Sequence, residues 1–499
     1  MPRNRNAQHS ISAEGVVIGA LFISLIALRI GEWCLARHSG AADSDTAAPL
    51  FSNIHYRALY ALLTALTISI VWTGMEKEKR WLFGAAFVAL HCLILYQAVV
   101  LSKDVIYGGD ASRRLFILPR YGFARIPESP SATRYAAVDR PSADFAAVYF
   151  TSQDPSSFED AYYPEKTLDP WQRPSRSAPL IHFICSLTFC RLKYGYACFS
   201  QFISQTLLFF CGFWLAFRAL GVKKCLLPSL LLANVCLFLT PVGLSWYERG
   251  QFSLYLGLSY LWLLLGLIKG KRVYVIVSAL FAFIKWLSLP CSGVILAAYV
   301  MDARGARQFK ERLATAAMFP LTVVILWLLF PGDGIHFLKG LCFQELHFGP
   351  YGVSLVKVAP RYAVKLLPVG LIAAGYMNIR KSQNGFGRLI PYFVGSAILL
   401  LTYPTLAWEY GLPSLLGFVP FVVYWALLPE VRGRVEGHVI KYGFFLFLIG
   451  GSFSFCVSEF YLEWVLIALY WGAGIVFVFA PYVLSRRMHM SAGGGREAR

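Results

Sequence analysis

The sequence predicts an all-α, polytopic integral membrane protein with about 14 (roughly 12–14) transmembrane or re-entrant helices. Three observations lead to this prediction. Of the 499 residues, 57% are apolar and only 15% are charged, against about 25% charged residues in a soluble domain. The 41 glycines and 25 prolines suit membrane helices, which tolerate both residue types. Apolar runs that approach the length of a membrane crossing also recur along the chain.

The composition excludes several classes of protein. A soluble enzyme of this length could not bury so much apolar surface, so a water-soluble enzyme is excluded. A disordered chain would be far more polar, and a secreted disulfide scaffold would be shorter and richer in cysteine.

The apolar runs define the expected spans. Crossing ~30 Å of hydrocarbon takes about 20 helical residues. The candidate spans lie near residues 15–36, 57–74, 82–101, 196–218, 225–242, 252–268, 273–286, 287–300, 313–330, 363–378, 389–405, 411–428, 440–457 and 461–484. The stretch 273–300 is predicted to form two short helices that meet at Lys285–Pro290, because a single crossing would place Arg304 and Arg307 on the outer side.

The formal charge of +19 is distributed unevenly between the segments predicted to lie on the inner side and those predicted to lie on the outer side of the membrane. With the N-terminus inside, the inner segments hold 24 Lys/Arg and 8 Asp/Glu, and the outer segments hold 15 Lys/Arg and 18 Asp/Glu. An excess of cations on the cytoplasmic side is the usual topology signal, and these cations also attract anionic lipid. We therefore expect a multi-pass protein of a bacterial inner membrane with both termini cytoplasmic, and no nucleic-acid partner.

Polarity and spans together divide the chain into five segments. These are an N-terminal three-span segment (1–101), an outer acidic loop with a re-entrant or interfacial helix (102–191), core spans (192–330), a second outer loop (331–362), and C-terminal spans with a basic inner tail (363–499).

Common catalytic and metal-binding motifs are absent from the sequence. It contains no P-loop, no GxGxxG that opens a helix after a strand, and no HExxH. The 11 cysteines form no CxxC pair. Neither a zinc site nor a disulfide framework is predicted, and ATP-driven chemistry is not expected.

Polar groups gather instead on the outer side. The loop 102–178 holds 10 of the 27 acidic residues, among them Asp110 and Asp144. Three further outer positions carry ionisable groups at the ends of spans, in WYERGQF (246–252), FIKWLSLP (283–290) and TYPTLAWEYGLP (402–413). Ionisable side chains at membrane depth are costly to desolvate, which favours a functional role. Together they predict an outer cavity lined by carboxylates and cations.

Such a cavity suits transfer of a sugar from a lipid-linked phosphate. A carboxylate would take the proton of the acceptor hydroxyl as that hydroxyl attacks the anomeric carbon. Cations would stabilise the charge that develops on the departing phosphate. One carboxylate suffices, whereas a glycosidase needs two.

The motifs that carry these groups also resemble those of a known family. They are DFAAVY (144–149), AYYP (161–164), RSAPLIHF (176–183), ERGQ (248–251), IKWLSLP (284–290) and TYPTLAWEY (402–410). In this order the set resembles glycosyltransferase family 87, polyprenyl-phosphate-dependent membrane enzymes of the GT-C superfamily whose best-known members are mannosyltransferases. The resemblance covers about residues 100–430. Tyr410 stands where the family has histidine, and Pro290 is displaced from the family's lysine–proline break.

The resemblance implies a hexosyltransferase, for mannose or another hexose, that acts on the outer face with inversion. Asp144 is expected to be the base, with Asp110 as its rival because it lies nearer the third span. Lys285 and Arg249 would bind the donor phosphate. The expected substrate-binding residues are Glu248, Gln251, Trp408, Glu409 and Tyr149.

The predicted partners are a polyprenyl-phosphate sugar donor, a lipid or glycan acceptor and the bilayer itself. No cofactor or metal ligand set is predicted, and assistance by a divalent metal is left open. The alternative function is a transporter or flippase of lipid-linked or small polar solutes. Transporters commonly contain inverted repeats and mid-bilayer broken helices, and no repeat is detectable here. A polymerase or ligase of surface polysaccharide would use the same kind of donor.

Overall fold

A computed structural model describes about half of the chain, in segments that begin at residue 143. The described residues are 143–154, 158–169, 174–221, 226–238, 246, 250–347, 351–352, 361–380, 386–401, 406–407, 409–428, 443–444, 447–448, 468 and 470–482. The three N-terminal spans, Asp110, Glu248, Arg249 and Trp408 lie outside them.

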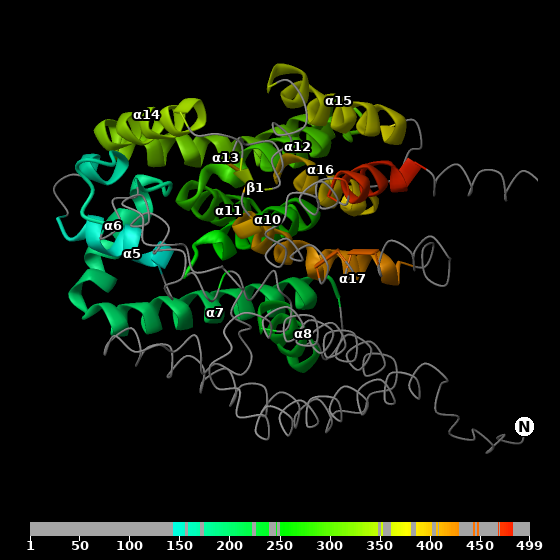
Figure 1. Ribbon diagram of the computed structural model, residues 1–499. Coiled ribbons are helices and arrows are strands. Elements are labelled where there is room, and N and C mark those ends of the chain that lie inside the picture. Colours follow the sequence, from blue (N-terminus) through cyan, green and yellow to red (C-terminus); the bar gives the residue numbers. More distant parts are fainter. Residues whose placement is uncertain are drawn as a thin grey trace, which may run out of the picture.

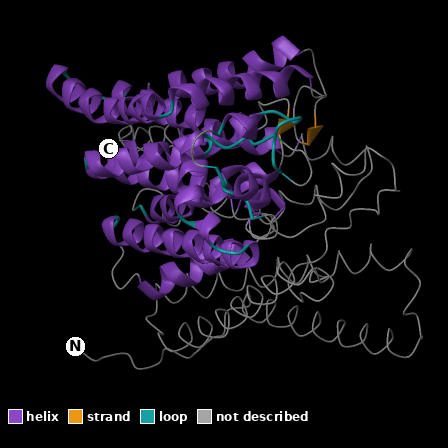
Figure 2. Cartoon of the chain, turned by 90° about the vertical axis from the view of Figure 1, so that its left-hand side faces the viewer, coloured by secondary structure: helices purple, strands orange, loops and turns teal. Residues whose placement is uncertain are grey.

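The described part is almost entirely helical (Figures 1 and 2), as the sequence predicts. Its α-helices are α5 (Ala143–Tyr149), α6 (Pro179–Leu187), α7 (Tyr194–Ala219), α8 (Leu226–Phe238), α10 (Ser253–Lys269), α11 (Arg272–Ile284), α12 (Leu289–Met301), α13 (Ala306–Leu329), α14 (Pro331–His347), α15 (Arg361–Arg380), α16 (Ile390–Leu401) and α17 (Val419–Leu427). A further apolar helix covers Tyr470–Tyr482. The 3₁₀ segments are η3 (Phe150–Ser152), η4 (Glu159–Tyr162), η5 (Phe189–Arg191), η6 (Trp286–Ser288), η8 (Phe386–Leu389) and η9 (Glu409–Phe418).

The only strand pair among the described residues is very short. Strand β1 (Tyr351–Gly352) pairs in parallel with β2 (Leu406–Ala407). Two residues in each strand add a local backbone link and leave the helical class of the fold unchanged.

The long helices α7, α10, α11 and α13 pack side by side, with α5 and α6 at one end of them (Figure 1). The close approach of α10 to η9 requires glycine on both segments. A Cβ added at Gly417 would lie 1.9 Å from the carbonyl oxygen of Gly257, and one added at Gly257 would lie 3.0 Å from that of Pro413. Because real Cβ atoms never come so close to backbone, any side chain at Gly417 would push α10 and η9 apart.

The chain reverses direction at Lys285. Helix α11 packs along α13, and Phe283 near the end of α11 contacts Trp327 near the end of α13, with their ring centroids 6.1 Å apart. These two helices therefore run the same way. Since α12 leads directly into α13 and Arg312 reaches back to the Tyr299 carbonyl at 2.8 Å, α12 runs the opposite way. The predicted pair of short helices is confirmed at the level of chain direction.

Charge differs between the two ends of this bundle. At one end, here called the basic end, lie Arg218, Lys269, Lys271, Arg272, Arg304, Arg307, Lys310 and Arg312, with Asp302 and Glu311. At the other, here called the α6 end, acidic and basic residues nearly balance: Asp144, Asp154, Glu159, Asp160, Glu165, Asp169 and Asp333, with Lys166, Arg176, Arg191, Lys193, Lys285 and Lys339.

Two expectations about local structure differ from the fold. Residues 331–347, expected in an outer loop, form the helix α14. Its Asp333 side chain accepts the Phe158 backbone N–H at 2.9 Å, so the polar residues that suggested a loop instead contact the 158–166 segment. The predicted span 411–428 begins as the 3₁₀ segment η9, which contains Pro413, and becomes α-helical only from Val419.

Among the described residues, two helices are long and apolar enough to cross a membrane, Tyr194–Ala219 and Ala306–Leu329. Several of the other apolar helices are shorter, including α10, α11 and α12. The predicted all-α class is therefore observed, while the number of spans stays a prediction.

Candidate active site

Three of the predicted site residues, from three separate segments, are joined by hydrogen bonds: Asp144 and Lys285 both contact the Gln251 carboxamide. The Nε2 group of Gln251 donates to Oδ2 of Asp144 in a short hydrogen bond. The Oε1 atom of the same carboxamide accepts a hydrogen bond from the Lys285 ammonium at 2.9 Å. Gln251 is buried, while Asp144 and Lys285 are half-buried. A carboxylate and an ammonium are thus fixed at opposite ends of one buried amide.

The turn that presents Gln251 is built by its neighbours. Gly250 has φ +62°, a left-handed conformation that glycine adopts without strain. The side chains of Gln201 and Gln205, one turn apart on α7, donate to the backbone carbonyls of Gly250 at 3.3 Å and Gln251 at 3.2 Å. Gln205 also accepts the indole N–H of Trp246 at 3.0 Å. The backbone at Gln251 is therefore anchored independently of its side chain.

Lys285 lies where α11 stops, between two apolar helices and outside both. Its backbone is extended (φ −144°, ψ +110°), and η6 and α12 follow. Desolvation lowers the pKa of the Lys285 ammonium from 10.5 to about 8; the nearby Asp144 carboxylate opposes this shift and the charge of Arg176 adds to it. The ammonium is protonated in most molecules at neutral pH.

Arg176 opens the RSAPLIHF motif (176–183), but the sequence alone predicted no role for this arginine in the site. Two residues after it, the Ala178 backbone N–H donates to the carbonyl of Ile284, the residue before Lys285, at 3.1 Å. One residue before it, the Ser175 backbone N–H donates to the Ala161 carbonyl at 2.7 Å. These bonds hold Arg176 beside the α11–η6 break, close enough for its charge to affect Lys285.

A buried histidine ties this segment to the helix that carries Asp144. The Ser152 hydroxyl donates to the Val148 carbonyl at 2.5 Å, so its oxygen accepts from Nδ1 of His182 at 2.8 Å. Nε2 of His182 then accepts from the Ser175 hydroxyl at 2.9 Å. Burial lowers the pKa of His182 from 6.5 to about 3, so the ring is neutral and both nitrogens are used.

Helix α5 is held in place by aromatic residues that follow Asp144. Phe145 is fully buried and contacts Phe252, the residue after Gln251, at 6.0 Å between ring centroids. Tyr149, which the sequence suggested for substrate binding, is only 6% exposed and donates its hydroxyl to the Leu192 carbonyl at 2.7 Å. Tyr149 thus ties α5 to the backbone at Leu192, and its part in substrate binding stays a prediction.

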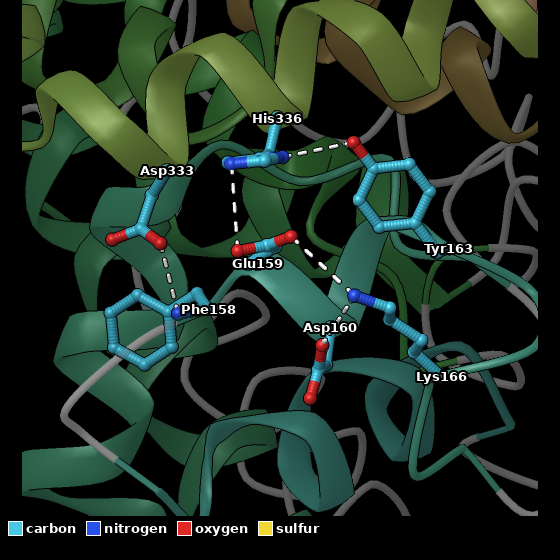
Figure 3. Close-up of polar contacts among 7 residues, drawn as sticks. All are labelled: Phe158, Glu159, Asp160, Tyr163, Lys166, Asp333 and His336. Carbon is cyan, nitrogen blue, oxygen red and sulfur yellow. Dashed lines mark hydrogen bonds and ion pairs between the residues drawn. The ribbon is translucent and has the colours of Figure 1, made fainter.

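Polar contacts join the 158–166 segment to α14. His336 lies between the Tyr163 hydroxyl, 2.9 Å from Nδ1, and the Glu159 carboxylate, 3.5 Å from Nε2. Figure 3 shows the whole set, formed by Phe158, Glu159, Asp160, Tyr163, Lys166, Asp333 and His336. The ion pairs are partly exposed, and such pairs contribute at most about 1 kcal/mol each. The two ion pairs of Lys166 lie within the 158–166 segment, whereas the contacts of Asp333 and His336 orient α14 over it.

The remaining predicted site residues are not placed. Asp110, Glu248, Arg249 and Trp408 lie outside the described residues, and Glu409 is described only as the first residue of η9. Within the described residues, no group of three or more His, Cys, Asp or Glu could hold a metal ion.

Comparison of the chain with protein-family models, curated proteins and solved structures identifies no match. Its function must therefore be inferred from its own residues and their geometry.

Proposed function

We propose that the chain is an integral-membrane glycosyltransferase that transfers a hexose, such as mannose, from a polyprenyl-phosphate donor to a lipid or glycan acceptor. The reaction takes place on the outer face and inverts the anomeric centre. One observation carries the proposal. Asp144 and Lys285, a carboxylate and a cation predicted from sequence to cooperate, bind the two ends of the Gln251 carboxamide.

The two groups supply what the transfer requires. The acceptor oxygen forms a bond to the anomeric carbon, and the bond from that carbon to the phosphate oxygen breaks. Asp144 takes the hydroxyl proton, and the electron pair leaves with the phosphate. Lys285 stabilises the negative charge that develops there. No group needs to protonate the phosphate, which is a good leaving group at neutral pH.

The position of Gln251 changes the role proposed for it. Both ends of its carboxamide are occupied, by Asp144 and by Lys285. We assign Gln251 to holding the base and the cation at a fixed separation, instead of orienting sugar hydroxyls. Well-oriented reacting groups account for much of an enzyme's rate advantage.

The other roles are proposed as the sequence suggested them. Arg249 joins Lys285 at the donor phosphate, Glu248 orients the sugar, and Trp408 with Glu409 lines the acceptor side. Asp110 remains the rival base. The lipid-linked sugar is a co-substrate, and the proposal requires no cofactor.

Exposed apolar surface supports a membrane setting. Helix α13 exposes a row of large aliphatic side chains: Leu313, Leu321, Val324, Ile325, Leu328 and Leu329. A row of exposed aliphatic side chains is typical of a surface that contacts lipid or protein. With the basic end of the bundle in the cytoplasm, the α6 end and its site face outward, as the positive-inside rule expects.

The test is donor consumption by the purified full-length chain in lipid nanodiscs. Polyprenyl-phosphate mannose with a radiolabelled sugar is supplied together with a bacterial lipid extract as the acceptor source. The proposal expects release of polyprenyl phosphate together with labelled glycolipid, and loss of both in Asp144→Asn. A parallel assay uses the same chain in proteoliposomes. Donor that crosses their bilayer without being consumed would support the transporter alternative and overturn the proposal.

A further inference from the structure

The backbone on either side of Arg176 is held beside the α11–η6 break, and the charge of Arg176 acts on Lys285. The backbone on one side of it is bonded to Ile284, next to Lys285, and on the other to Ala161. Ser175, its immediate neighbour, is buried and bonded to the neutral His182, which also binds Ser152 of the segment that follows α5. Arg176 is thus placed by a rigid buried network, although the residue itself is half-buried.

The charges of the site explain why a second cation belongs there. The sugar donor is a phosphodiester with one negative charge. In the proposed site the charges of Asp144 and Lys285 cancel, and so do those of Glu248 and Arg249. With these four residues alone, the occupied site would carry one uncompensated negative charge, which is costly away from water.

Adding Arg176 makes the occupied site neutral before and after the reaction. Before transfer, two cations face Asp144 and the diester. After transfer, Asp144 holds the proton and is neutral, and the departing polyprenyl phosphate carries two negative charges opposite the same two cations. The charge that Asp144 loses therefore appears on the phosphate, and no counter-ion has to move.

We propose that Arg176 binds the phosphate of the lipid-linked substrate together with Lys285. This inference rests on the proposed function and adds a residue that the sequence did not single out. A guanidinium suits the role because its planar N–H groups can donate two parallel hydrogen bonds to phosphate oxygens, which a lysine cannot do.

The experiment measures binding of undecaprenyl phosphate to the purified full-length chain in nanodiscs. This probe is a polyprenyl phosphate, the product that the proposed transfer releases whatever the sugar. Wild type is compared with Arg176→Gln, Arg176→Lys and the control Arg191→Gln, an exposed arginine in η5. Undecaprenol and inorganic phosphate are tested in parallel, so that contributions of lipid tail and phosphate are separated.

We expect Arg176→Gln to bind undecaprenyl phosphate about tenfold or more weakly, because one charge-assisted contact is lost. Arg176→Lys should fall between Arg176→Gln and wild type, and Arg191→Gln should match wild type. Undecaprenol should bind all proteins equally weakly. If wild type binds inorganic phosphate as tightly as undecaprenyl phosphate, the site does not require the lipid, and the proposed lipid-linked substrate is wrong.

The outcomes separate this inference from the proposed function. Wild type that binds undecaprenyl phosphate no better than undecaprenol would contradict the function itself. Wild-type affinity in Arg176→Gln, with binding intact in wild type, would overturn only the role of Arg176. If Arg176→Gln does not fold, Arg176→Lys decides, since equal affinity in Arg176→Lys and wild type would contradict a bidentate contact.

Discussion

Asp144 and Lys285 bind opposite ends of the same Gln251 carboxamide, although Asp144 lies in α5 and Lys285 in the break between α11 and η6. The amide nitrogen can only donate, and the amide oxygen can only accept. Its orientation is therefore fixed by a carboxylate at one end and an ammonium at the other. A change in any one of these three side chains should disturb the other two.

Replacing Gln251 should reduce turnover without unfolding the protein. Gln251→Leu keeps the side-chain size but cannot bridge Asp144 and Lys285, so we expect kcat to fall about 10²-fold because both reacting groups lose their orientation. The unfolding temperature should fall less than in a variant that removes a fully buried contact, since Asp144 and Lys285 are only half-buried and Gln201 and Gln205 still hold the backbone. Steady-state kinetics and thermal unfolding of the same preparation measure the two effects.

Gln205→Leu is the matched control, because it removes a structural amide of the same network. It leaves Trp246 and the Gln251 carbonyl without their partner, at a cost of about 1–3 kcal/mol. The unfolding temperature should fall clearly in this variant. A larger stability loss in Gln251→Leu than in Gln205→Leu would mean that Gln251 serves the fold instead of the site.

Activity should decline as the pH rises through about 8. The pKa of Lys285 is lowered to about 8, so the ammonium loses its proton and its charge above that value. Arginine stays charged at every accessible pH. We expect Lys285→Arg to retain activity above about pH 9, where wild type has lost most of it, and Lys285→Ala to be about 10²-fold slower at neutral pH. An unchanged alkaline limb in Lys285→Arg would assign the titration to another group.

The stability of the fold should depend on pH through His182. Its pKa is about 3 in the folded protein and 6.5 when solvated, so only the unfolded chain takes up the proton as the pH falls below 6.5. Stability is then lost by up to about 1.4 kcal/mol per pH unit. His182→Gln should be less stable at neutral pH but less sensitive to acid.

Thermal unfolding between about pH 7 and pH 4.5 measures this difference. His336→Gln provides the control, since His336 is partly exposed at Glu159 and is not buried in the 152–175 network. If His182→Gln and wild type lose stability in parallel as the pH falls, the histidine is not kept neutral by burial.

Labelling on intact cells tests which side of the membrane the site faces. Cys342 on α14 is exposed at the α6 end, and Ala306 is exposed at the basic end. With Cys342 as the sole cysteine, an impermeant thiol reagent should label the protein from outside. With Ala306→Cys as the sole cysteine, labelling should require permeabilisation. The opposite pattern would remove the outer-face site.

Much of the fold follows from the sequence because local signals mark it. The apolar runs predict the helices from α7 to α13, and Pro290 with Lys285 marks the break before α12. Helix α14 was not predicted because Gly332, Gly334 and charged residues interrupt its apolar pattern. It also depends on contacts with the 158–166 segment, which lies 173 to 175 residues earlier in the chain at the two hydrogen bonds.

The site was predictable only in part, for a similar reason. Asp144, Gln251 and Lys285 stand out as polar groups beside apolar segments. The bridging role of Gln251 depends on the hydrogen bond from the Gln205 side chain that holds the Gln251 backbone. This is a contact between distant parts of the chain, which local sequence does not reveal. Arg176 could not be singled out from sequence because its loop contains many other lysines and arginines. A usable signal was its position just before the apolar helix α6, between Ser175 and Ser177.

The central claim is that Asp144 is the base of a sugar transfer, and one substitution tests it most directly. Asparagine keeps the shape of Asp144 and can still contact Gln251, but it cannot take a proton. Donor binding and turnover are measured on the same preparations of wild type, Asp144→Asn and Asp110→Asn. The account predicts that Asp144→Asn binds donor like wild type and does not turn it over, while Asp110→Asn remains active. Full turnover by Asp144→Asn would contradict the account.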